Sequence, residues 1–165
     1  MALLLLGLGL AATARGSFPG FEPITDGIGV LNATAPPHSV DPTGATDVTK
    51  SLQQAIDAAK AQNLALLLPA GRYLVSDSLL ANQINWAKSD GGINIVPNRF
   101  RSNVIIGSSA ALPSRPVIVL KANSPGFANA SVTENVLKIH NPGDENINMN
   151  QIIRGVDFEI QPGNP

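Results

Sequence analysis

The chain has 165 residues and a formal net charge of −1, from 11 Lys and Arg against 12 Asp and Glu. This length predicts one domain, and the near-neutral charge argues against the basic surface with which proteins neutralise nucleic-acid phosphates. We therefore expect no nucleic-acid partner. The sequence has no Cys and two His, which excludes disulfides, thiolate metal sites and Cys nucleophiles.

Residues 1–15 are predicted to form a signal peptide. Residues 2–14 read A-L-L-L-L-G-L-G-L-A-A-T-A, an apolar run shorter than the about 20 residues that span a bilayer. The small residues Ala12 and Ala14 provide a cleavage pattern before Arg15. No Lys or Arg precedes the run, so a buried strand or helix is the alternative. We expect a secreted or periplasmic protein that has no membrane contact once the leader is removed.

Residues 16–37 are rich in Gly, Pro, Thr and Asn, which predicts an irregular lead-in. An amphipathic helix is predicted over residues 48–61, because apolar residues recur there at helical spacing after the N-cap residue types Thr46 and Asp47. The apolar face consists of Val48, Leu52, Ala55, Ile56 and Ala59.

Beyond this helix the apolar runs are short and are bounded by Gly, Pro, Asn or Ser, a pattern typical of strands. The predicted strands are residues 64–68, 72–76, 93–96, 103–106, 117–121, 136–140 and 155–160. Continuous runs such as V-I-V-L at 117–120 are typical of parallel sheets, whereas residues 156–160 alternate. This mixture favours a parallel solenoid of stacked coils, with an antiparallel sandwich as the alternative.

Residues 41–76 carry a family resemblance. Their segments D-P-T-G-A-T-D-V-T-K-S-L-Q-Q-A-I-D-A-A and L-L-L-P-A-G-R-Y-L-V-S resemble the N-terminal segment of the pectate lyase superfamily domain. The sequence departs from the family pattern at residues 42–44, where Gly-Asp-Gly is usual, and at Val48, where a second Asp is common. The resemblance implies a mainly β fold, a right-handed parallel β-helix whose N-terminal end is capped by the helix over residues 48–61.

Family members are usually several hundred residues long, so we expect residues 38–165 to be the cap and first coils of a domain truncated at its C-terminus. The uncapped coil would expose apolar side chains, and we expect self-association through this open end. The resemblance implies a polysaccharide partner, cleaved by a lyase or a glycoside hydrolase whose complete active site lies beyond this chain. The alternative is a noncatalytic adhesin or tailspike-like stalk that binds carbohydrate.

Asp157 and Glu159 are the candidate catalytic residues. They lie at positions i and i+2 of a predicted strand, so both should project from its outer face. Paired carboxylates can act as acid and base, or bind Ca²⁺ beside an acidic sugar. The alternative is an ordinary solvated strand face.

Two further residues are candidates for substrate binding. A guanidinium can pair with the carboxylate of a uronic acid, and Arg154 is our candidate among the basic residues of the strands and loops, which also include Arg72 and Arg115. Trp86 is the sole Trp, and an indole can stack on a sugar ring. The alternative for Arg154 is an ordinary surface charge, and the alternative for Trp86 is simple packing.

We predict no metal site and no cofactor. Residues 144–150, D-E-N-I-N-M-N, begin like the calcium loop of an EF-hand, but Met149 replaces the Gly of the sixth position and Gly155 replaces the Glu of the twelfth. A polar turn explains this segment better, with bound Ca²⁺ as the alternative.

Overall fold

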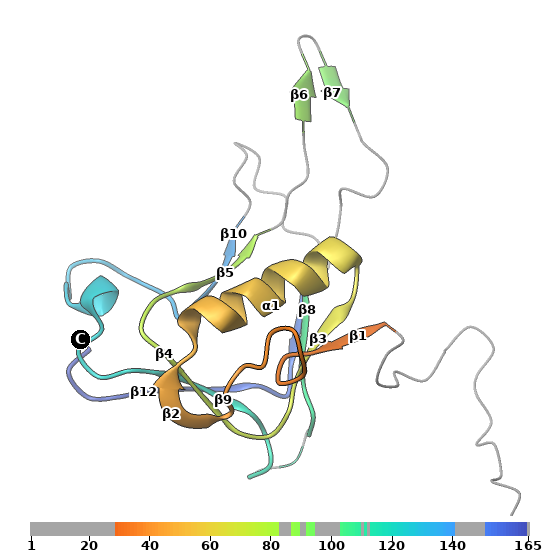
Figure 1. Ribbon diagram of the computed structural model, residues 1–165. Coiled ribbons are helices and arrows are strands. Elements are labelled where there is room, and N and C mark those ends of the chain that lie inside the picture. The colour runs from red at the N-terminus through yellow and green to blue at the C-terminus, as the bar shows by residue number, and fades with distance from the viewer. Residues whose placement is uncertain are drawn as a thin grey trace, which may run out of the picture.

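Figure 1 shows a computed structural model of the chain, which describes residues 29–82, 87–89, 92–94, 103–109, 111, 113–140 and 151–164. The predicted signal peptide, Trp86 and the calcium-like segment 144–150 lie outside the described residues. The described chain is mainly β with one α-helix. Neither that helix nor any other described one is long and apolar enough to cross a membrane.

Most of the strands follow the short apolar runs of the sequence. In chain order they are β1 (Val30–Asn32), β2 (Thr43–Asp47), α1 (Thr49–Gln62), β3 (Ala65–Leu68), β4 (Arg72–Val75), β5 (Leu79–Asn82), β6 (Ala87–Ser89), β7 (Gly92–Asn94), β8 (Val104–Gly107), β9 (Val117–Leu120), the 3-10 helix η1 (Pro125–Phe127), β10 (Leu137–His140), β11 (Ile152–Arg154) and β12 (Asp157–Ile160). The predicted helix over residues 48–61 is therefore present as α1. The ranges predicted as strands did not include β1, β2, β5, β6 or β11, and β1 lies within the segment expected to be irregular.

The strands form three parallel sheets, ordered β1-β3-β8-β11, β2-β4-β9-β12 and β5-β10. Strands that follow one another in the chain go to different sheets, and the chain then returns to the first sheet. Among the described strands the one antiparallel pair is the hairpin β6–β7, which projects away from the sheets (Figure 1). The arrangement is compatible with a parallel β-helix and differs from the antiparallel sandwich.

The core is built from side chains that stack in register between successive strands. The stacked sets are Tyr73, Ile118 and Phe158; Val75, Leu120 and Ile160; and Leu66, Ile105 and Ile153. Tyr73 is fully buried, and its hydroxyl donates a 2.8 Å hydrogen bond to the carbonyl of Pro69. This bond satisfies the polar atom of the core aromatic residue, and burial raises the pKa of Tyr73 to about 12.

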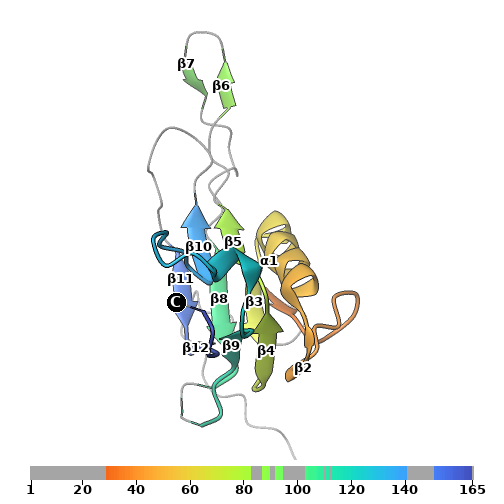
Figure 2. The same cartoon turned by 90° about the vertical axis from the view of Figure 1, so that its left-hand side faces the viewer.

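Helix α1 covers the N-terminal end of this core. Its buried residues Leu52, Ala55, Ile56 and Ala59 belong to the same apolar cluster as the stacked strands. Figure 2 shows α1 beside β3, on the side opposite β11. The helix begins after Asp47, whose carboxylate accepts a 2.9 Å hydrogen bond from the amide of Thr49, and it ends at Asn63 in a left-handed conformation with φ of 59°.

Gln53 of α1 closes the edge of β5. Its side-chain amide donates to the carbonyl of Leu80 over 2.9 Å, and its carbonyl accepts from the amide of Leu80 over 2.7 Å. A primary amide offers one donor and one acceptor side by side, as a neighbouring strand would. In the other two sheets, β1 and β2 pair with β3 and β4 at this end. Among the described strands, none pairs with the corresponding edge of β5, and the Gln53 side chain bonds to the backbone there instead.

We expect Gln53→Ala to lower the free energy of unfolding by about 1 kcal/mol, because two hydrogen bonds to the β5 backbone are lost and replaced by water. Urea unfolding followed by circular dichroism would measure this loss. Gln54→Ala is the matched control, since Gln54 lies on the exposed side of the same helix. Equal effects of the two substitutions would contradict the edge-closing role.

Gly107 lies where β8 passes close to the following coil. A Cβ placed on it would overlap the backbone carbonyl of Gly155 and approach the ring of Pro116 to 2.8 Å. Gly155 itself adopts φ of +67° in the turn between β11 and β12. The absence of a side chain at Gly107 therefore lets these two turns approach each other.

We expect Gly107→Ala to destabilise the protein by about 3 kcal/mol, because backbone atoms rather than a flexible side chain oppose the added methyl group. Urea unfolding again provides the measurement. Gly126→Ala is the control, since a Cβ there meets only the Asp77 side chain, at 3.3 Å. A loss at Gly107 no larger than that at Gly126 would show that the turns can separate without cost.

Candidate functional site

Asp157 and Glu159 lie on the outer face of the sheet β2-β4-β9-β12. Phe158, which lies between them in the strand, is in register with the core residue Ile118. Side chains alternate along a strand, so the two carboxylates project away from the core. This is the orientation that the spacing of the sequence predicted.

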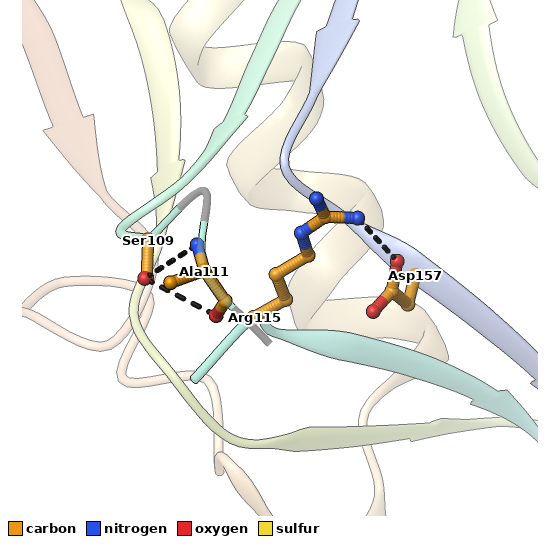
Figure 3. Close-up of polar contacts among 4 residues, drawn as sticks. All are labelled: Ser109, Ala111, Arg115 and Asp157. Atoms are coloured by element: carbon orange, nitrogen blue, oxygen red, sulfur yellow. Dashed lines mark hydrogen bonds and ion pairs between the residues drawn. The ribbon is translucent and has the colours of Figure 1, made fainter. Parts of the chain in front are cut away.

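Asp157 forms an ion pair with Arg115 (Figure 3). The Nη1 atom of Arg115 lies 3.3 Å from Oδ1 of Asp157, and both side chains are about one-third exposed, at 34% and 35%. Arg115 lies in the turn that leads from β8 to β9. In the same turn, the Ser109 hydroxyl accepts a 3.1 Å hydrogen bond from the amide of Ala111. The turn thus presents Arg115 to the strand of the next coil.

Glu159 forms a shorter ion pair with Arg72. The Nη2 atom of Arg72 lies 2.7 Å from Oε1 of Glu159, although 87 residues separate them in sequence. Arg72 lies on β4 and Glu159 on β12, with β9 between them in the sheet, so the Arg72 side chain spans β9. Val119 of β9 is 1% exposed and lies outside the core cluster, which is consistent with a cover of this kind over the outer face.

The ion pair determines which chemistry Glu159 can perform. The hydrogen bond from Arg72 and its positive charge lower the pKa of Glu159, and the same contact raises the pKa of Arg72. A general acid needs a pKa near the working pH. Glu159 is therefore ionised at neutral pH, and it is suited to accepting hydrogen bonds rather than donating a proton.

The structure does not bring Arg154 to these carboxylates. Arg154 ends β11, which belongs to the sheet β1-β3-β8-β11, and the turn at Gly155 separates that sheet from β12. Trp86 lies outside the described residues. The carboxylates instead meet Arg72 and Arg115, two of several basic residues among which the sequence could not choose. The missing signal was the strand register, which no short-range pattern reveals.

A third carboxylate lies at the other edge of the same sheet. Burial acts to raise the pKa of Asp47, but hydrogen bonds from Ser76 and Thr49 and the charge of Lys121 lower it overall. Among the described residues, no group of three or more His, Asp or Glu side chains could hold a metal ion. The charged side chains of this face are therefore arranged as ion pairs and hydrogen-bonded turns.

The Arg72–Glu159 pair predicts an acid-sensitive contribution to stability. Because the pKa of Glu159 is lowered on folding, this contribution is present at neutral pH and is lost as the pH falls below the ordinary glutamate value of about 4.3 and through the folded value. We expect Glu159→Gln to have a lower Tm than the wild type at neutral pH, with the difference vanishing in acid. Arg72→Gln should behave in the same way. A Tm difference that stays constant with pH would exclude the ion pair as its cause.

Comparison with known families places this geometry in context. Residues 38–160 match the family described as Rhamnogalacturonase A/epimerase, pectate lyase-like. No curated protein and no solved structure matches the chain. The matched range includes α1, the two ion pairs and all strands of the three parallel sheets except β1. It confirms the resemblance seen in residues 41–76, and the chain belongs to this pectate lyase-like family.

Proposed function

We propose that the chain is the N-terminal part of a secreted, right-handed parallel β-helix protein that acts on a polysaccharide. The observation that carries this proposal is the pectate lyase-like family match over residues 38–160, on a chain whose three sheets are parallel. Right-handedness follows the general rule for crossovers between parallel strands, about 98% of which are right-handed. The complete protein would be a lyase or a glycoside hydrolase.

We assign the sugar-binding surface to the outer face of β4, β9 and β12. The two ion pairs place guanidinium donors beside carboxylate acceptors, and the four side chains keep between 34% and 47% of their surface exposed. Sugar hydroxyls need donors and acceptors of this kind, and uronate carboxylates pair with guanidinium groups. A polymer lying across the strands would meet Arg72, Arg115, Asp157 and Glu159 in turn.

Binding, rather than proton transfer, is the role that the ion pairs support. In glycoside hydrolysis one carboxylic acid must be protonated to release the leaving group, whereas Arg72 lowers the pKa of Glu159. The same observation favours a second candidate, a noncatalytic carbohydrate-binding stalk. The two candidates share the binding surface and differ in whether sugar fragments are released.

The binding surface predicts substitutions of opposite sign. For a uronate polymer, we expect Arg72→Gln to weaken binding by about tenfold, because a charge-assisted hydrogen bond contributes about 1.4 kcal/mol. Glu159→Gln should strengthen binding, because it releases the Arg72 guanidinium from its internal partner. Affinity electrophoresis and calorimetry with polygalacturonate, rhamnogalacturonan and laminarin would measure both effects.

Two controls separate this face from general charge effects. Glu134→Gln removes the same charge as Glu159→Gln but breaks the Glu134–Lys138 pair instead, and Arg154→Gln removes a guanidinium from the neighbouring sheet. Neither should change the affinity as the tested variants do. Weakening by Glu159→Gln would indicate a neutral glycan, release of shorter sugars would identify an enzyme, and failure to bind every polymer would contradict the proposal.

A further inference from the structure

The edge strand β2 bulges where it passes Arg72. Thr43 of β2 is in register with Arg72, and Asp47 is in register with Leu74, so residues 44–46 lie opposite Tyr73 alone. A bulge bends its strand and changes the direction of neighbouring side chains. Figure 2 shows β2 beside β4, on the side away from β9. The bulge therefore lies behind Arg72, whose guanidinium extends in the other direction across β9 to β12.

Hydrogen bonds to Asp41 hold the bulge in shape. One oxygen of this carboxylate accepts a 2.9 Å hydrogen bond from the amide of Thr43, and the other accepts a 2.7 Å hydrogen bond from the hydroxyl of Thr46. The Thr43 hydroxyl in turn accepts a 3.2 Å hydrogen bond from the amide of Ala45. Local bonds of this kind give the backbone an alternative to a regular ladder. The bonds from Thr46 and Thr43 also lower the pKa of Asp41, so the carboxylate is ionised at neutral pH and accepts both.

Gly44 is the residue of the bulge that lies against Arg72. It adopts φ of +75°, and a Cβ placed on it would lie 3.1 Å from Cβ and 3.9 Å from Nε of Arg72. The first distance is shorter than the about 3.5–4.0 Å of an ordinary contact between carbon atoms. A methyl group at Gly44 would therefore push the base of the Arg72 side chain, and a small shift there grows along the chain toward the guanidinium.

Arg72 needs support of this kind to keep one direction. Its side chain has many rotamers and keeps 47% of its surface exposed, so ordering it costs conformational entropy. The bulge restricts it on one side, and the 2.7 Å contact with Glu159 holds it on the other. A guanidinium whose direction is fixed before a ligand arrives loses less freedom when the ligand binds.

We propose that Asp41 and Gly44 are positioning residues for Arg72 and, through it, for the sugar-binding surface. Gly44 leaves the space in which the base of the Arg72 side chain lies, and Asp41 holds the bulge against it. The effect on sugar binding rests on the proposed function. The effect on the Arg72–Glu159 ion pair does not depend on any sugar, so the two can be tested separately.

Thermal unfolding of the 165-residue chain at neutral pH measures the coupling to the ion pair. In the Gly44→Ala background, Glu159→Gln should lower the Tm by less than it does in the wild type, because the ion pair is already weakened. Gly29→Ala is the matched control. Its φ of +79° imposes similar backbone strain, but a Cβ there meets no other atom of the described chain within 4 Å. It should leave the effect of Glu159→Gln unchanged.

Asp41 provides a second variant that adds no strain at Gly44. Asp41→Ala releases the bulge and should also reduce the effect of Glu159→Gln on the Tm. Asp41→Asn keeps one carbonyl oxygen as an acceptor and should reduce this effect less. The positioning role is overturned if Glu159→Gln lowers the Tm equally in the wild type, the Gly44→Ala and the Asp41→Ala backgrounds, or if Gly29→Ala acts as Gly44→Ala does.

Calorimetry with polygalacturonate measures the effect on binding. Gly44→Ala should weaken binding by less than the about tenfold loss expected for Arg72→Gln, and it should cause no further loss in a chain that already carries Arg72→Gln. Stronger binding, or a further loss in that double variant, would show that Gly44 does not act by positioning Arg72. If the wild type binds no polymer, the proposed function fails, and the unfolding experiment alone decides whether Asp41 and Gly44 position Arg72.

Discussion

In-register stacking of apolar side chains between parallel strands is the constraint on which the rest of this structure depends. Tyr73, Ile118 and Phe158 lie above one another from coil to coil, and the residues between them point outward. A slip of one residue would exchange the two faces of a strand. It would then turn Asp157 and Glu159 toward the core rows and Phe158 toward the outer face. The outer ion pairs therefore exist only because the inner rows determine the register.

The two ends of the stack differ in whether the apolar core is covered. At the N-terminal end, α1 buries four apolar residues against the core, and Gln53 bonds to the free backbone edge of β5. At the other end, the last row of side chains is exposed. The ion pairs of Arg72 and Arg115 hold the carboxylates of β12 toward the preceding coils.

The outer face shows how ion pairing directs chemistry. Arg72 crosses β9 to reach Glu159 and lowers its pKa, which favours a surface that binds sugar over one that protonates a leaving group. Membership in the pectate lyase-like family supports a carbohydrate-active protein in general. The four side chains of the two ion pairs define where on β4, β9 and β12 the proposed sugar-binding surface lies.

The sequence by itself determined α1, because its apolar face repeats at helical spacing, and most of the coil strands, because each is a continuous or alternating apolar run between turn residues. It did not reveal β2, whose residues T-G-A-T-D are mainly exposed, or the three-residue strand β11. It also placed Asp157 and Glu159 on one outer face through their alternation alone. Only the tertiary structure decided that Arg72 and Arg115, rather than Arg154, meet them. The paired residues are 87 and 42 positions apart in sequence, and contacts at such separations depend on core packing and not on local pattern.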